Sequence, residues 1–300
     1  MLNLNHTIHL YRLWLKTLQP FRANSHTMLA LPEGLLIDTI IHAGINLASY
    51  NRYISTWPAL ENIYPVMNNL EVVICDDSID DCKNLPAVHH LSIIRCRSLT
   101  DLSALRNFKF LSSLKLHRCH SLSDFSALQN LTITDLCLSL SDSLTDIFPL
   151  SSLTNLGSLT IEWCHNFSDI SALIPLTKLT SLKILGCNGL TNFSAMDSLT
   201  NLTSLDLSGC YGLTVIPPLS SLTNLTSLNL SYCGSLTSIS AMQKLTNLTS
   251  LNLSYCCSLT DISAMRYLTK ITDLDLCECV GIEHVSALQN LTNLISLRMP

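Results

Sequence analysis

A motif of the form Leu-x-Leu-x-x-Cys recurs along most of the chain at a nearly constant interval. From Leu136 onward the leading leucine of the motif returns every 23 residues, and before Leu136 the intervals are 21, 23 and 22 residues. A unit of this size cannot bury its apolar side chains alone, so the interval predicts a solenoid of stacked, equivalent coils. The leading leucines are Leu70, Leu91, Leu114, Leu136, Leu159, Leu182, Leu205, Leu228, Leu251, Leu274 and Leu297.

The spacing of apolar residues within a unit predicts its local structure. Side chains alternate along a strand, so the two leucines of Leu-x-Leu point to one side of a short strand. Later apolar positions, such as Leu236, Ile239 and Met242, return through a turn or a single helical turn and cover the same core. The sequence therefore predicts an α/β solenoid over residues 65–300. Its curved parallel sheet lies on the concave side, its short helices or turns lie on the convex side, and a small helical segment precedes it.

These motifs resemble the leucine-rich-repeat superfamily over roughly residues 65–300. The cysteine followed by Leu-Thr-Asp resembles the cysteine-containing repeats of eukaryotic F-box proteins, whereas Ile-Ser-Ala-Leu followed by Leu-Thr-Asn-Leu resembles bacterial internalin-type repeats. The subfamily therefore stays open. The resemblance implies a scaffold that binds a protein partner on its concave face.

Nine of the thirteen cysteines occupy one position of the repeat. Ser141 is the only break in the series, and serine keeps a small hydrogen-bond donor. We therefore expect a buried structural ladder whose thiols donate to backbone carbonyls. An odd number of in-line thiols argues against disulfides and favours a reducing compartment, the cytoplasm, or a host cytosol if the protein is a secreted effector. The expected thiol ladder is Cys75, Cys96, Cys119, Cys164, Cys187, Cys210, Cys233, Cys256 and Cys279.

The cysteines also raise two interpretations other than this ladder, a structural zinc site and a reactive thiol. The thiols lack the paired Cys-x-x-Cys spacing of structural zinc sites, so we expect no metal. Cys137 and Cys277 fall at positions that face the concave surface, where a thiol could be reactive.

The repeat stops upstream of about residue 65, and two helical segments are expected there. Residues 1–28 form an amphipathic helical extension, and residues 29–64 form either a helical cap or a degenerate F-box. An F-box would bind a Skp1-type adaptor, whereas any amphipathic helix pair could cover the open edge of a solenoid. Gly34 departs from the F-box pattern because an acidic residue is usual there. The residues that resemble an F-box are Leu31, Pro32, Leu35, Leu36, Ile40, Leu47, Ile54 and Trp57.

Residues between and just after the leucines are expected to face the concave side. They run from basic in the early units, through aromatic, to acidic in the last unit. Aromatic residues and arginine are the usual anchors of protein interfaces, and a charge gradient would orient a partner. The candidate partner-binding residues are Arg95, Lys115, His117, Arg118, Glu162, Trp163, Lys183, Tyr232, Tyr255, Asp273, Asp275 and Glu278.

Composition excludes several other functions. Apolar residues make up 47% of the chain, charged residues make up 13%, and the net charge is -5, which gives no general attraction to nucleic acid or to an anionic membrane. The longest apolar stretch is interrupted by Asp38 and His42 and is too short to span a bilayer, and the N-terminus does not read as a secretory signal. We find no phosphate-binding glycine loop, metalloprotease motif or nucleophile elbow, so we expect neither a cofactor nor an enzyme.

The sequence favours a protein-binding scaffold, and two forms of it stay open. One is the substrate receptor of a Skp1-cullin-F-box ubiquitin ligase. The alternative is an effector or adaptor without an F-box, whose N-terminus serves only as a cap. The sequence stops inside a strand, at Arg298, Met299 and Pro300, so either this strand frays or its uncovered edge forms an end-to-end contact.

Overall fold

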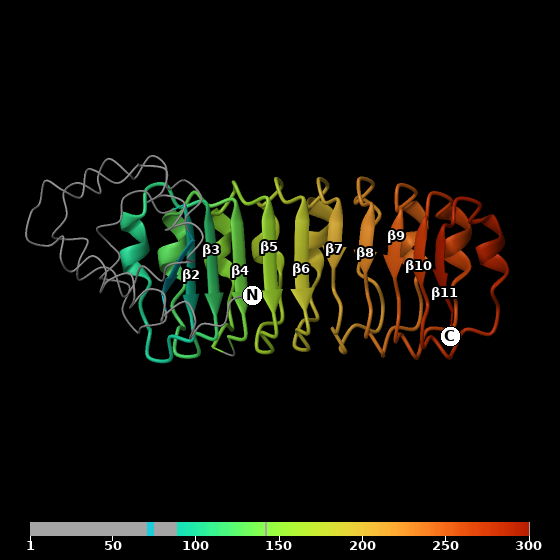
Figure 1. The fold of residues 1–300 in the computed structure, drawn as a ribbon, viewed down its shortest axis with the longest axis horizontal. Helices are drawn as coiled ribbons and strands as arrows, with labels where there is room; N and C mark the ends of the chain where they lie inside the picture. Colours follow the sequence, from blue (N-terminus) through green and yellow to red (C-terminus); the bar gives the residue numbers. More distant parts are fainter. Residues whose placement is uncertain (1–70, 75–88, 142, 300) are drawn as a thin grey trace, which may run out of the picture. The chain divides into compact units, whose positions relative to one another are not determined.

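The computed structural model describes residues 71–74, 89–141 and 143–299, and for residues 71–74 the backbone alone. The expected helical segments 1–28 and 29–64, every F-box candidate, and Cys75 lie outside these residues. In the described part, eleven parallel strands form one sheet in sequence order (Figure 1). The strands are β1 (Glu71–Ile74), β2 (His90–Ile94), β3 (Ser113–His117), β4 (Asp135–Ser139), β5 (Ser158–Glu162), β6 (Ser181–Leu185), β7 (Ser204–Asp206), β8 (Ser227–Asn229), β9 (Ser250–Asn252), β10 (Asp273–Asp275) and β11 (Ser296–Arg298).

Short 3-10 helices lie on the other side of the coils, one in most units. Seven of the eight described helices begin at the same recurring Ser-Ala sequence, and the other begins at Phe148, which Pro149 follows. The unit between β7 and β8 has no such helix, and it carries Pro217 and Pro218, which cannot donate backbone hydrogen bonds. The helices are η7 (Ser103–Asn107), η8 (Ser126–Asn130), η9 (Phe148–Ser152), η10 (Ser171–Leu173), η11 (Ser194–Ser198), η12 (Ser240–Lys244), η13 (Ser263–Tyr267) and η14 (Ser286–Asn290).

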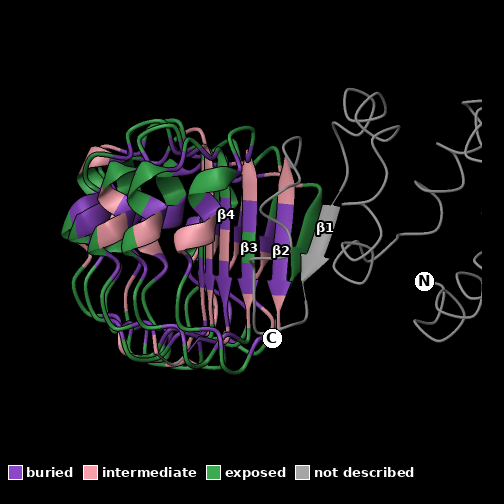
Figure 2. Ribbon diagram, turned by 90° about the vertical axis from the view of Figure 1, so that its left-hand side faces the viewer, coloured by how far each residue is buried: buried purple, intermediate pink, exposed green. Residues whose placement is uncertain are grey.

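The register of the sheet follows the repeat. From Leu91 onward each leading leucine pairs with the next one along the array, as Leu205 does with Leu228. Leu91 itself pairs with Val72, so the prediction of Leu70 as the leading residue of the first unit is wrong. From β2 to β10 both apolar residues of each motif are buried between the sheet and the 3-10 helices, and the side chains of Leu236, Ile239 and Met242 close the same core. Figure 2 shows this buried interior between the two layers. The predicted leucine-rich solenoid is confirmed, with turns of 3-10 helix as its second layer.

The cysteines form the predicted ladder along one side of the core. The eight described members of the series, Cys96 to Cys279, are at most 2% exposed, and Ser141 takes the missing place at 2%. Each thiol from Cys164 onward donates to a carbonyl of the preceding unit, for example Cys256 Sγ to the Leu230 oxygen at 3.1 Å. None of the described cysteines forms a disulfide.

The strands fall into two groups by length, and one residue of the repeat explains the difference. Strands β2 to β6 have five residues, whereas β7 to β10 have three. In the short strands the residue after the leading leucine is Asp or Asn, and its side-chain oxygen accepts the N–H two residues later. Asn252 Oδ1, for instance, accepts the Ser254 N–H at 2.9 Å. This local bond replaces the next bond of the sheet and so ends the strand early.

The same bond changes the thiol ladder. In a long strand this N–H would donate to a carbonyl of the neighbouring strand. Because the Asp or Asn side chain binds the N–H instead, the carbonyl accepts the thiol of the ladder cysteine more closely, and the Sγ–O distance is shorter. It is 3.8 Å from Cys187 to Ile161 O, where the strand is long, and 3.3 Å from Cys210 to Ile184 O, where the Ser208 N–H is bound by Asp206. The shortest distance is 2.9 Å, from Cys279 to Leu253 O.

Polar ladders hold the outer loops together. Five successive threonine hydroxyls, from Thr180 to Thr272, each donate to a carbonyl one unit earlier at 3.0 to 3.1 Å. Asparagine amides do the same between loops, as Asn247 Nδ2 does to Thr223 O at 2.8 Å. Most repeated polar side chains of the motif therefore form hydrogen bonds within the fold, and few of these positions are left to bind a partner.

Candidate binding face

The exposed face of the sheet carries two kinds of predicted site residue, and the structure separates them. Lys115, Lys183 and Asp275 lie on the strands, one residue after a leading leucine, where the side chain points away from the core. Asp273 begins β10, and His117 and Glu162 end their strands, on the same side of the sheet. These six residues form the strand part of the candidate face.

The other six predicted residues lie beyond the strand ends, one position after β2, β3 and β5 and three positions after the shorter β8, β9 and β10. They belong to a row that occurs in every unit from β2 to β10, immediately before the ladder cysteine. We call this the exit row. Its members are Arg95, Arg118, Leu140, Trp163, Gly186, Gly209, Tyr232, Tyr255 and Glu278.

Every residue of the exit row has a positive φ, from 53° at Trp163 to 68° at Gly209. The left-handed conformation suits glycine, and it costs other residues of order 1–3 kcal/mol. Seven of the nine are not glycine. The backbone therefore holds large side chains, Trp and two Tyr among them, in an unfavourable conformation at the rim of the sheet.

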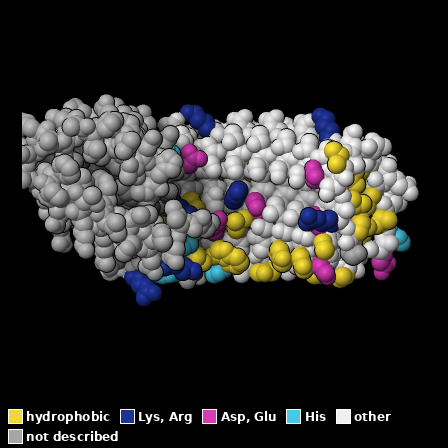
Figure 3. All heavy atoms as spheres, viewed as in Figure 1, with side chains coloured by type: hydrophobic (Ala, Val, Ile, Leu, Met, Phe, Trp, Pro, Cys, Tyr) yellow, Lys and Arg dark blue, Asp and Glu magenta, His cyan; other side chains and the backbone are white. Residues whose placement is uncertain are grey.

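Aromatic side chains gather along this rim. Trp163 is 45% exposed, Tyr232 48% and Tyr255 40%, and the last two rings stack at 4.5 Å with 5° between their planes. Figure 3 shows hydrophobic side chains in a line along the lower edge of the sheet face, with Lys and Arg at one end. This line is the feature of the face with the character of a protein interface.

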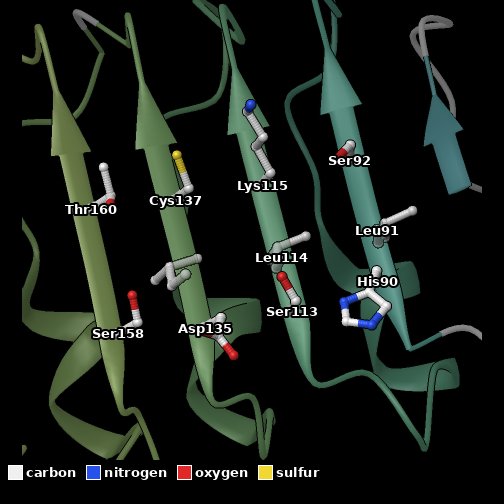
Figure 4. A pocket seen from close by; sticks show the side chains of 11 residues that line it. His90, Leu91, Ser92, Ser113, Leu114, Lys115, Asp135, Cys137, Ser158 and Thr160 are labelled. Atoms are coloured by element: carbon white, nitrogen blue, oxygen red, sulfur yellow. The ribbon is translucent and has the colours of Figure 1, made fainter. Parts of the chain in front are cut away.

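A hollow lies on the sheet face toward its N-terminal end. It has a volume of about 430 Å³ and spans four strands, from β2 to β5 (Figure 4). The Lys115 ammonium, the His90 ring and the Asp135 carboxylate supply its charged and titratable groups. Its lining consists of His90, Leu91, Ser92, Ser113, Leu114, Lys115, Asp135, Leu136, Cys137, Ser158 and Thr160.

Cys137 occupies the floor of this hollow, as its sequence position suggested. Its sulfur lies 3.3 Å from the Ser139 hydroxyl oxygen. Burial raises the pKa of the Cys137 thiol, so the protonated form dominates at neutral pH. A protonated thiol is a weak nucleophile, and the geometry therefore favours a lining role over a reactive one.

Three basic residues, Arg95, Lys115 and Arg118, lie together around His117 at the N-terminal end of the face. Burial, together with the charges of Arg118, Lys115 and Arg95, lowers the pKa of His117, so this imidazole is neutral at pH 7. The Glu162 carboxylate acts on it in the opposite direction and is the weakest of these influences. At the other end of the array Asp273, Asp275 and Glu278 bring negative charge, and Arg298 Nη1 binds Asp275 Oδ2 at 3.2 Å.

Sequence reasoning missed several residues of this face. His90, Ser113, Asp135 and Ser158 precede the leading leucines, and strand alternation places them on the exposed side together with the residues that follow those leucines. It also missed His165, whose ring meets that of Trp163 edge-on at 6.3 Å. The role of Gly186 and Gly209 could not be predicted from the sequence, because it depends on the backbone conformation of the exit row.

Two observations bear on other functions. Within residues 89–141 and 143–299, no three side chains among His, Cys, Asp and Glu come together as metal ligands would. None of the short helices in the described part of the chain has the length and apolar character needed to cross a bilayer.

Comparison with known families supports the repeat. Residues 119–233 match the sequence model of the R13L1/DRL21 leucine-rich repeats. Residues 182–296 match that of the BspA type leucine rich repeat region. No curated protein sequence matches the chain.

Solved structures with the same architecture include bacterial proteins. An internalin, inlF, from Listeria monocytogenes is similar with a TM-score of 0.59 and 25% identity, over 79% of this chain and 77% of that one. The leucine-rich repeat domain of the type III effector XopL has a TM-score of 0.52 and 18% identity, over 89% of this chain and 94% of that one. The XopL likeness concerns the fold alone.

Proposed function

We propose that this leucine-rich-repeat chain is a non-catalytic scaffold that binds a partner protein through its exposed sheet face and the exit row. The observation that carries the proposal is the row of strained, exposed side chains, among them Trp163 and Arg118, along one rim of a regular sheet. Backbone strain that persists through a repeat is a reason to look for function at that position.

The experiment is an affinity capture with the full chain, followed by mass spectrometry of the retained proteins. Arg118 and Trp163 are changed to Ala together, and Lys244→Ala on η12, on the opposite layer, is the control. A partner of this face is retained by wild type and by the control, and is lost with the double variant while the melting temperature stays close to wild type. Retention by all three would place the contact elsewhere.

Two forms of the scaffold differ in the role of the N-terminus. The effector or adaptor form has no F-box, and the likeness of the repeats to an internalin supports it. The ubiquitin-ligase form rests on the F-box resemblance from Leu31 to Trp57 and on the cysteine-type repeats that follow it.

Binding to a Skp1-type adaptor separates the two forms. The purified adaptor is titrated against the full chain and against a Leu35→Asp/Leu36→Asp variant. Saturable binding that the variant loses supports the ligase form. Absence of binding by wild type rejects it and leaves the effector or adaptor form.

A reducing compartment, such as the cytoplasm or a host cytosol, is part of the proposal. The ladder thiols support it because they are buried and donate hydrogen bonds to carbonyls, for which they must stay reduced.

A further inference from the structure

Two glycines interrupt the exit row between its aromatic members. Gly186 is covered by the Trp163 indole, since a Cβ on Gly186 would stand 2.6 Å from Cε3 of that ring. A Cβ on Gly209 would meet only backbone atoms of Gly186, at 3.5 Å, so no side chain comes within 4 Å of that position. The Trp163 side chain thus leans along the rim over the next unit and stops before Gly209.

The next member of the row after Gly209 is a second aromatic residue, Tyr232. The Tyr232 ring stacks on Tyr255, which covers the face turned toward β9. We call the part of the row formed by Gly186 and Gly209, between Trp163 and Tyr232, the glycine notch.

Positive charge flanks the notch on one side only. Arg95 and Arg118 belong to the same row toward the N-terminal end, and both are exposed. Within the described part of the chain neither forms an ion pair, whereas Arg298 at the far end does. Beyond the notch in the other direction the row ends in Glu278, so the rim is polarised along its length.

We propose that the exit row binds an extended, acidic segment of the partner protein, with carboxylates on Arg95 and Arg118 and a bulky apolar or aromatic side chain in the glycine notch. This rests on the proposed function and specifies the partner for it. The segment crosses the strands with its acidic end over β2 and β3, because the Glu278 carboxylate repels that end from the other side.

The repeat sets the spacing of the recognised side chains. Arg118 and Gly209 lie four units apart in the exit row, and neighbouring strands are about 4.8 Å apart, which gives roughly 19 Å. An extended chain advances about 3.3 Å per residue, so the acidic and the apolar side chains should be about six residues apart.

The test begins with a phage-displayed library of random twelve-residue peptides, selected on the full chain. Enriched sequences should place Asp or Glu about six residues from Phe, Trp, Tyr or Leu. The best of them is then made with a fluorescent label, and binding is measured by fluorescence anisotropy. A basic consensus, or no enrichment at all, would overturn the inference.

Two variants place the peptide on the exit row. Gly209→Tyr fills the notch with a residue that the row already carries at Tyr232 and Tyr255, and it should weaken binding at least tenfold without loss of folding. Arg118→Glu should weaken binding to a similar extent, and exchange of the acidic peptide residue for Lys should restore it. Lys244→Ala should bind as wild type does.

The outcomes distinguish this inference from the proposed function. Peptides that ignore Gly209→Tyr and Arg118→Glu but depend on Lys115 and Lys183 would overturn the notch and leave the sheet face as the binding surface. Peptides that depend on neither set would overturn both. A third outcome is that a second copy of this chain occupies the face and no peptide binds. In that case Gly209→Tyr would change the mass of the protein in solution, and the inference would be contradicted.

Discussion

A single thiol shows how one residue serves the fold. Burial raises the pKa of Cys256 to about 12, so its S–H is present at neutral pH and donates to the Leu230 carbonyl at 3.1 Å. The hydroxyl of Ser141, at the same place in an earlier unit, donates to the Ser139 carbonyl at 3.4 Å. The requirement at this position is therefore a small donor in an apolar environment.

We predict that Cys256→Val lowers the free energy of unfolding by about 1 kcal/mol, because the Leu230 carbonyl loses the thiol donor and keeps only the longer bond from the Cys233 N–H, at 3.3 Å. Cys256→Ser should cost less, since serine keeps the donor. The matched control is Cys187→Val, where the thiol stands 3.8 Å from its carbonyl and the long strand β6 supplies the sheet bond. Urea unfolding measures all three, and an equal loss for both valine variants would contradict the account.

The exit row gives a second prediction at the residue scale. Glu278 is exposed and has a φ of 59°. The free energy of unfolding of Glu278→Gly should therefore exceed that of Glu278→Ala by about 1 kcal/mol. Asp273, exposed on β10, is the control: there alanine should be the better replacement, because glycine loses more conformational freedom on entering a strand. The same order at both positions, measured by urea unfolding, would reject the strain argument.

At the scale of the element, a polar side chain accepts the first N–H of seven of the eight described 3-10 helices, η7 to η13. The Asp261 Oδ1 atom accepts the Ser263 N–H at 2.8 Å, ahead of η13, and Asn192 serves η11 in the same way at 3.0 Å. Hydrogen bonds from Ser103 and Ser126 hold the pKa values of Asp101 and Asp124 below the ordinary aspartate value, and the Ser263 N–H lowers that of Asp261.

These lowered pKa values predict an acid-sensitive contribution to stability. A carboxyl whose pKa is lower in the folded chain than in the unfolded chain binds a proton more readily when the chain unfolds. Its contribution to the free energy of unfolding is therefore present above the unfolded pKa and is lost as the pH falls through the folded pKa. Changing Asp101, Asp124 and Asp261 together to Asn keeps an oxygen acceptor, as Asn192 does, but removes the titration. The melting temperature of this variant should fall less between pH 5 and about pH 3 than that of wild type. Parallel curves would contradict the prediction.

At the scale of the whole molecule, the last strand of the sheet is open on one side. Strand β11 pairs with β10, and Ile295 and Leu297 beside this edge are 85% and 43% exposed. An exposed apolar edge can pair with another chain, and the end-to-end contact expected from the sequence stays a prediction.

If copies of the chain associate through this edge, the mass from light scattering rises above 33.2 kDa with concentration, and Leu297→Lys returns it to that of a single chain. Tyr267→Lys, an exposed position on η13, should associate as wild type does. A constant mass of one chain for wild type would exclude the contact.

The sequence by itself determined the solenoid, its register and the buried thiol ladder. A strict interval aligns equivalent residues, and one coil cannot bury its leucines without the next, so no other arrangement satisfies the pattern from Leu91 to Leu297. Only the tertiary structure decided what happens at the strand ends. The left-handed turn at Trp163 and Tyr232, the indole over Gly186 and the glycine notch depend on backbone angles and on neighbours one unit away. The residue pattern cannot predict these because arginine, tryptophan and tyrosine carry no intrinsic preference for that conformation; the stacked coils on either side impose it.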